Sequence, residues 1–160
     1  MDVVEFHDVE AELGVGRSTT VLPHVNGKPL PLLLELAAGG RRERSRRAVP
    51  FGGSHGLVED EVRWPSRHYL GEPVLGSFDD DTALLGCGCG IYSCRPFSAV
   101  VEVDDDVVVW SRFRFADPDV LLTDLRDLVF DRAQYEAAVR TTEIGGGGRV
   151  YRSRVHRSVR

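Results

Sequence analysis

The sequence has no long apolar stretch and no recognisable targeting segment at its start. None of its apolar runs approaches the roughly 18 consecutive residues that a membrane-spanning helix needs. The first residues, MDVVEFHDVE, are acidic and have neither the positive start nor the apolar middle of a signal peptide. We therefore expect a protein that contacts no membrane and works in the cytoplasm. The apolar fraction of 42% is that of an ordinary globular protein, which argues against wholesale disorder.

Cysteine and lysine are both scarce. The 160 residues include three cysteines, all within GCGCGIYSC (86–94), and an odd number in one cluster argues against a disulfide framework. Cysteines in the cytoplasm are expected to be reduced. Lys28 is the only lysine among 20 basic side chains. The net charge of −5 disfavours a wholly basic nucleic-acid-binding domain.

Hydrophobic periodicity and turn residues predict an α+β fold in a single domain, residues 1–143. The expected strands are residues 3–13, 18–25, 82–89, 94–103 and 107–115, and the expected helices are residues 30–38 and 131–142. We expect the strands to form one antiparallel sheet of four or five strands. Residues 48–80 are expected to be irregular, and residues 120–130 to form a short helix or turn. Asp131, followed three residues later by Gln134, is the expected N-cap of the final helix.

Residues 144–160 are expected to form a flexible basic tail attached through the glycines GGGG. Its segment RVYRSRVHRSVR contains no acidic residue. Arginine-rich segments of this kind can bind the phosphates of RNA or DNA. They can equally fold back on acidic loops or remain solvated. Weak nucleic-acid binding through the tail is therefore one hypothesis.

The strands between residues 82 and 115 predict a meander whose two faces differ. We expect Leu85 opposite Ser98 and, across a three-residue loop, Val103 opposite Val107. The core face then comprises Phe97, Ala99, Val101, Val103, Val107, Val109, Phe113 and Phe115. The opposite face comprises Cys87, Cys89, Cys94, Ser98, Trp110, Arg112 and Arg114. This register predicts that the thiols lie beside two arginines and a tryptophan, away from the core.

Three segments of the chain resemble a family of small bacterial proteins to which no activity is attached. They are SRHYLGEP (66–73), ALLGCGCGIYSCRPF (83–97) and FDRAQYEAAV (130–139), and they occur in the family's order. The family pattern is SRHxLGEP, then LLGCxCGxxGCxP, then FDRAQYEAA. The chain differs at Ser93 and Arg95, where the family tends to have glycine and tryptophan. The resemblance implies a shared architecture over residues 66–139 and implies no function.

The cysteines permit three hypotheses. Cys87, Cys89 and Cys94 could supply three ligands of a zinc site, with His68 or His55 as the fourth. Cys89 and Cys94 could instead form a redox pair across two strands. The third hypothesis is that the thiols are reduced and pack as small apolar side chains. The sequence leaves these hypotheses open, with zinc as the one possible cofactor.

The segment SRHYLGEP contains the atoms of a catalytic site without its expected arrangement. Ser66 and His68 need not meet, although a catalytic serine must reach its histidine, and the chain has no GxSxG elbow. We interpret the segment as a structured loop pinned by hydrogen bonds. The leading hypothesis is a non-enzymatic binding or interaction module with an unknown protein partner. Its candidate binding face comprises Arg67, His68, Trp110, Arg112 and Arg114.

Overall fold

The structure, a computed structural model, describes residues 1–14, 16–37, 54–76, 80–89, 96–116, 119–121 and 125–144. One antiparallel sheet contains β1 (Val4–Leu13), β2 (Gly16–Val25) and β3 (Lys28–Pro29). The second contains β4 (Ser54–His55), β5 (Thr82–Cys87), β6 (Phe97–Val103), β7 (Val107–Ala116), β8 (Asp119–Leu121) and β9 (Leu128–Asp131). Within the described residues, the α-helices are α1 (Leu30–Ala37) and α3 (Arg132–Arg140), and the short 3-10 helices are η2 (Asp60–Val62) and η3 (His68–Leu70).

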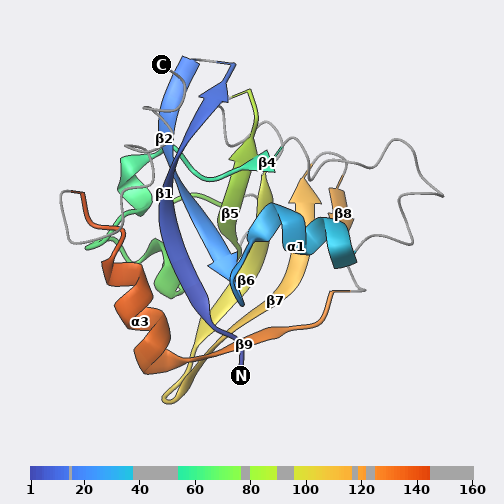
Figure 1. The fold of residues 1–160 in the computed structure, drawn as a ribbon. Coiled ribbons are helices and arrows are strands. Elements are labelled where there is room, and N and C mark those ends of the chain that lie inside the picture. Colours follow the sequence, from blue (N-terminus) through green and yellow to red (C-terminus); the bar gives the residue numbers. More distant parts are fainter. Residues whose placement is uncertain are drawn as a thin grey trace.

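The two sheets enclose one hydrophobic core. In Figure 1 the hairpin of β1 and β2 lies in front of the larger sheet, with α3 on one side and α1 on the other. Buried apolar side chains come from both sheets and both helices, and they include Phe6, Val21, Leu34, Leu85, Phe97, Trp110 and Tyr135. The predicted α+β fold with an antiparallel meander and a C-terminal helix is confirmed. The prediction of one sheet of four or five strands is wrong, because the N-terminal strands form a sheet of their own.

Backbone hydrogen bonds beside the strands join the two sheets at two seams, in addition to a bond between Gly14 and Gly88. On one side, Val21 of β2 and Leu57 exchange hydrogen bonds of 2.8 and 3.1 Å. On the other side, the amide of Asp2 donates to the carbonyl of Val129 at 2.7 Å. Because a two-stranded hairpin is marginal alone, these seams and the shared core stabilise β1 and β2.

The seam at Val21 requires a glycine at position 56. A Cβ atom on Gly56 would lie 2.4 Å from the carbonyl oxygen of Val21, which is closer than real Cβ contacts allow. The backbone of β2 therefore could not keep its present distance from residue 57.

We predict that Gly56→Ala lowers the free energy of unfolding by about 1–3 kcal/mol, the usual cost of forcing an extra methyl group into a packed site. Urea unfolding followed by circular dichroism measures this change. Ala137→Ser, which adds one atom on the exposed side of α3, is the control. Equal stability of the Gly56 variant and the unmodified protein would contradict the close approach.

The predicted register between β6 and β7 is wrong. The structure pairs Val103 with Val108 and Val101 with Trp110, one residue away from the prediction. The turn is also shorter than expected, because the amide of Asp104 donates to the carbonyl of Val107 at 2.8 Å. A one-residue displacement moves every side chain to the opposite face. Val108 and Trp110 are therefore fully buried, and the predicted core residues Val107 and Val109 are only half-buried.

Further along the same strands, a β-bulge returns Phe113 and Phe115 to the core face on which they were predicted. The register shifts between Ser98 and Val100, and opposite this region Arg112 has a positive φ of 53°. An extra residue in one strand lets side chains on either side of the bulge point the same way although their sequence spacing is odd. Phe115 consequently lies opposite Phe97, and Trp110 on the other side of the bulge is also buried. In the neighbouring pair, Leu85 lies opposite Phe97 and not opposite Ser98.

Predictions for the other segments differ in outcome. Both predicted helices are confirmed, and Asp131 caps α3 by accepting a hydrogen bond of 2.9 Å from the amide of Gln134. The prediction of a short helix or turn over 120–130 is wrong, because the described residues there include strands β8 and β9. β9 forms because its residues pair with the free edge of β7, which no local pattern reveals. The predicted tail lies outside the described residues except for Ile144.

Candidate functional site

The candidate binding face predicted from the sequence does not assemble as one surface. Trp110 is fully buried, so its predicted place on that face is wrong. The cause is that Val101 of β6 pairs with Trp110 and not with Val109, one residue away from the predicted register. Arg112 is exposed at the bulge, and Arg114 is half-buried beside Ser98. Arg67 is exposed and forms an ion pair with Glu72.

His68 lies in the interior, where both of its ring nitrogens form hydrogen bonds. Nδ1 accepts from the amides of Val74 and Leu75 at 3.1 and 3.4 Å. Because Nδ1 is an acceptor, Nε2 carries the hydrogen and donates to the carbonyl of Ala83 at 2.8 Å. The imidazole therefore fastens the loop after η3 to β5. A metal could bind His68 only if some of these hydrogen bonds were broken.

Burial lowers the pKa of His68 from 6.5 to about 4, and the hydrogen bond to Ala83 opposes this effect only in part. The folded state thus favours neutral imidazole, whereas the unfolded chain binds a proton more readily. The resulting stability is fully present above pH 6.5 and is lost as the pH falls through 6.5 towards 4.

We predict that acidification from pH 7 to pH 4 removes about 3 kcal/mol of stability through His68 alone, the difference between pKa values of 6.5 and about 4. Other groups titrate in this range, so the quantity to measure is the difference between the unmodified protein and His68→Asn. Denaturant unfolding at several pH values should show a flatter pH dependence for the variant. Parallel pH dependences would show that the imidazole does not stay neutral in the fold.

A chain of buried hydrogen bonds connects β7, α3 and η3. The indole Nε1 of Trp110 donates to the hydroxyl of Tyr135 at 2.9 Å, and this hydroxyl donates to the carbonyl of Tyr69 at 2.6 Å. Phe6 packs on the ring of Tyr69, with 4.6 Å between the centroids. The hydroxyl of Tyr69 is itself buried and finds no hydrogen-bond partner in the described part of the chain. Tyr135 is therefore the polar link, and Tyr69 contributes its backbone carbonyl and its ring.

We predict that Tyr135→Phe destabilises the protein by about 1–3 kcal/mol for each buried polar group that it leaves without a partner. The matched variant Tyr69→Phe also removes one hydroxyl from a buried tyrosine, yet it should be neutral or slightly stabilising. Unfolding free energies of both variants, measured in urea at one pH, provide the comparison. A larger loss for Tyr69→Phe than for Tyr135→Phe would contradict these roles.

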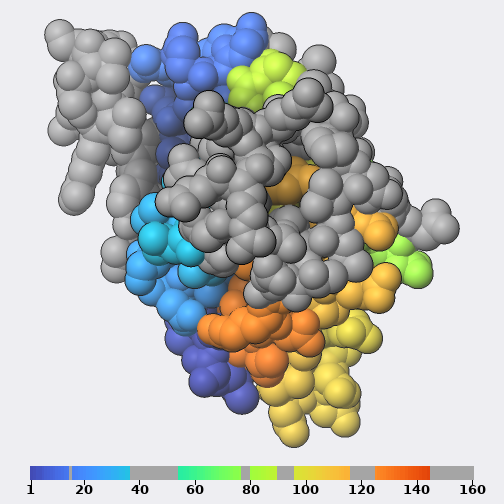
Figure 2. Space-filling view, turned by 90° about the vertical axis from the view of Figure 1, so that its right-hand side faces the viewer, coloured from blue at the N-terminus to red at the C-terminus, as the bar shows by residue number. Residues whose placement is uncertain are grey.

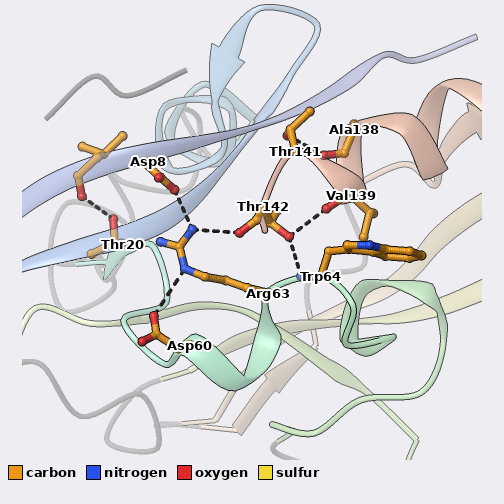
Figure 3. A network of polar contacts seen from close by, with 10 residues as sticks. Asp8, Thr20, Asp60, Arg63, Trp64, Ala138, Val139, Thr141 and Thr142 are labelled. Carbon is orange, nitrogen blue, oxygen red and sulfur yellow. Dashed lines mark hydrogen bonds and ion pairs between the residues drawn. The ribbon is translucent and has the colours of Figure 1, made fainter. Parts of the chain in front are cut away.

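A buried arginine connects three segments that are distant in the sequence (Figure 3). Nη1 of Arg63 donates to Oδ1 of Asp8 at 2.8 Å and to the carbonyl of Thr142 at 3.0 Å. The amide of Trp64 donates to the hydroxyl of Thr142 at 2.8 Å. The network holds the η2 segment against β1 and against the end of α3. Its polar groups are used within the fold, so we assign it a structural role.

Two of the three cysteines lie in a described turn at the end of β5. Cys87 and Cys89 are both half-buried, and no disulfide joins them to each other. The amide of Cys89 lies 3.4 Å from the sulfur of Cys87 and donates to it. Cys94 and the predicted Cys89–Cys94 pairing lie outside the described residues. Among the residues that are described, no group of three or more His, Cys, Asp or Glu side chains is placed to hold a metal ion, and the zinc hypothesis stays a prediction.

A pocket that the sequence reasoning missed lies between α1 and the larger sheet, and we name it the α1 pocket. Its volume is about 270 Å³. The described side chains that line it are Leu30, Leu33, Leu34, Phe113, Leu125, Arg126 and Leu128. In Figure 2, α1 (cyan) and the chain around β9 (orange) appear on the same face of the molecule. A signal was present in the sequence, since the leucines of α1 cover more than half of its circumference and a helix with one buried face needs a narrower apolar stripe.

Among the described residues that line the α1 pocket, Arg126 is the one charged side chain, and its charge is compensated. The guanidinium of Arg126 donates to both carboxylate oxygens of Asp2, at 2.8 and 3.0 Å. This hydrogen-bonded pairing holds the pKa of Asp2 well below its usual range. The pocket therefore offers an apolar lining with a neutralised ion pair.

Comparisons with known proteins identify no relative: no protein-family model, no curated protein and no solved structure matches the chain. The resemblance of the three segments to a bacterial family stays a prediction. In the described part of the structure, no helix has the length and apolar character needed to cross a bilayer.

Proposed function

We propose that the protein is a non-enzymatic binding protein and that its α1 pocket receives an apolar side chain of a partner polypeptide. The observation that carries this proposal is the pocket itself, which lies beside an apolar helix surface and has six apolar side chains among its described lining. None of these described lining residues is a nucleophile or a general acid or base, so the lining is suited to binding rather than to chemistry.

The size of the pocket favours a single anchoring side chain of a partner polypeptide over a free ligand. Sites for drug-sized molecules and cofactors usually enclose about 300–1,000 Å³. The α1 pocket, at about 270 Å³, falls just below that range. It is large enough for one bulky side chain, such as leucine or phenylalanine, with some space to spare. A nucleotide or a flavin would not fit within it.

The surface around the pocket favours a polypeptide as the source of that anchor. Leu32 and Leu36 are 43% and 61% exposed, and Leu33, which lines the pocket, lies next to them on the helix. Residues three and four positions apart on a helix are neighbours, so these leucines form one apolar surface that extends beyond the pocket. A small molecule inside the pocket would leave Leu36 in water. A partner chain could fill the pocket and cover this surface together.

The ion pair at the pocket favours a neutral group over an acidic one. A fatty acid or another carboxylate would require an uncompensated cation, whereas the one cation of the described lining, Arg126, already donates to Asp2. Competition with Asp2 would cost the ligand much of the gain from that contact. An apolar side chain needs no such contact, and burying it contributes about 1.5–3 kcal/mol.

Selection from a random peptide display library against the immobilised protein tests the proposal. We predict that the selected peptides share a large apolar anchor residue. Leu36→Lys should weaken their binding at least about tenfold, which corresponds to the loss of one buried leucine contact. Ile144→Lys is the matched control, because Ile144 lies beyond the end of α3 and is similarly exposed, at 64%. Binding that falls equally in both variants, or a library that yields no peptide, would contradict the proposal.

Two further measurements distinguish a partner's side chain from the other occupants that the pocket could have, which are the chain itself and a second copy of it. Benzene enters apolar cavities of about 150 Å³. Its titration should therefore shift the leucine methyl signals of α1 in a saturable way if the pocket is open. The absence of a shift would mean that the chain fills its own pocket. Sedimentation at increasing concentration should show a monomer, and a dimer that Leu36→Lys dissociates would identify a second copy as the occupant. Either of these two results would overturn the proposal.

A further inference from the structure

We propose that Cys87 and Cys89 are a redox-active dithiol that closes reversibly into a disulfide. This inference concerns a different part of the molecule from the α1 pocket. It also differs from the pairing of Cys89 with Cys94 that the sequence suggests.

The turn places the two cysteines within disulfide range. Cys87 is the last residue of β5, and Gly88 and Cys89 form the turn that follows. Two residues of extended strand span roughly 6.6 Å, and a turn shortens that distance, so the Cα atoms fall in the range of about 4.4–6.8 Å that disulfides require. The sulfur of Cys87 is also directed towards its neighbour, since the amide of Cys89 donates to it at 3.4 Å. Closure then requires the two side chains to rotate so that the sulfurs meet.

Neighbouring strands hold this turn in place on two sides. On one side, Ser54 of β4 pairs with Cys87. On the other side, the amide of Gly14 donates to the carbonyl of Gly88 at 3.1 Å. A Cβ atom on Gly14 would lie only 2.7 Å from the carbonyl oxygen of Cys89, so the β1–β2 hairpin contacts the turn closely. The dithiol thus lies on a rigid support rather than at the end of a loose loop.

A disulfide at this position is better suited to switching than to structural support. The stabilisation that a disulfide provides through chain entropy grows with the length of the loop that it closes, and this loop is very short. Closure between residues two positions apart also tends to strain the bond, and strained or accessible disulfides are the ones that are readily reduced. Both cysteines are half-buried, so a small disulfide can approach the pair.

The reaction needs a low-molecular-weight disulfide, such as glutathione disulfide, as the oxidant. The thiolate of Cys87 attacks one sulfur of the oxidant, which forms a mixed disulfide and releases one glutathione thiolate. The thiolate of Cys89 then attacks the sulfur of Cys87, which forms the Cys87–Cys89 bond and releases the second glutathione. Two protein thiols are oxidised, one glutathione disulfide is reduced to two thiols, and the protons pass to the released thiolates and the solvent. Excess reduced glutathione reverses both steps.

Three serine variants test the pairing, because each retains a different pair of cysteines. Cys94→Ser retains the proposed pair, Cys87→Ser retains Cys89 with Cys94, and Cys89→Ser retains Cys87 with Cys94. Variants are needed because trypsin cannot separate the cysteines: no lysine or arginine lies between Arg67 and Arg95, so all three remain in one peptide. Each variant is equilibrated with glutathione buffers of increasing oxidised fraction, and its thiol count and intact mass are then measured.

We expect Cys94→Ser to lose both thiols and two hydrogen atoms in mass while keeping no glutathione. It should close at a lower fraction of oxidised glutathione than the other two variants and regain both thiols in excess reduced glutathione. Cys94→Ala is the substitute if the serine variant does not fold. Three results would overturn the proposal: Cys94→Ser remains reduced, it accumulates only glutathione adducts or linked dimers, or Cys87→Ser closes more readily. Because none of these measurements involves α1, failure here would leave the proposed binding function untouched.

Discussion

The backbone groups at the edges of two separate sheets need hydrogen-bond partners, and the rest of the structure depends on this requirement. β1 and β2 form a long hairpin that has too little surface of its own for stability in water. The exchange of hydrogen bonds between Val21 and Leu57, and the bond from Asp2 to Val129, attach this hairpin to the larger sheet on both sides. Edge groups that would otherwise be open to pairing with another chain are used within the fold at these points. The close approach at Gly56 follows from the same requirement.

Buried polar groups give the irregular segment between α1 and β5 its described conformation. Regular secondary structure is sparse in residues 54–76, so the segment cannot rely on long ladders of backbone hydrogen bonds. Arg63 attaches it to β1 and to the end of α3, and His68 attaches it to β5. Tyr135 attaches η3 to α3. His68 was a predicted site residue, but the hydrogen bonds of all three side chains are used to organise the fold.

The two candidate sites occupy different parts of the molecule and differ in chemistry. The described lining of the α1 pocket is apolar apart from Arg126, whose charge is compensated by Asp2. The turn of Cys87 and Cys89 lies at the end of β5, where the hairpin turn at Gly14 meets it. In Figure 1, α1 lies beside the larger sheet, whereas the β1–β2 turn lies at the top of the molecule. The proposed binding surface and the proposed redox-active turn can therefore be altered one at a time.

The sequence by itself determined the features that depend on neighbouring residues. Asp131 caps α3 as predicted, and the leucine-rich segment is helical, because capping and helix formation need only a few residues on either side. Valine-rich alternation likewise identified the main strands and their meander order, although it could not set their register. The cysteine turn was not predicted, because the sequence pattern extended the strand to Cys89 whereas β5 ends at Cys87, and its support by Gly14 was not visible either.

Only the tertiary structure decided which residues meet across the chain. Trp110 is buried because a short turn and a bulge at Arg112 set the register of β7, and a shift of one residue reverses the face of every side chain. Strand β9 exists because β7 offers an open edge, and the α1 pocket exists because a helix from residue 30 faces residues near 113 and 128. Such contacts depend on the relative placement of distant segments, and local patterns contain no information about that placement.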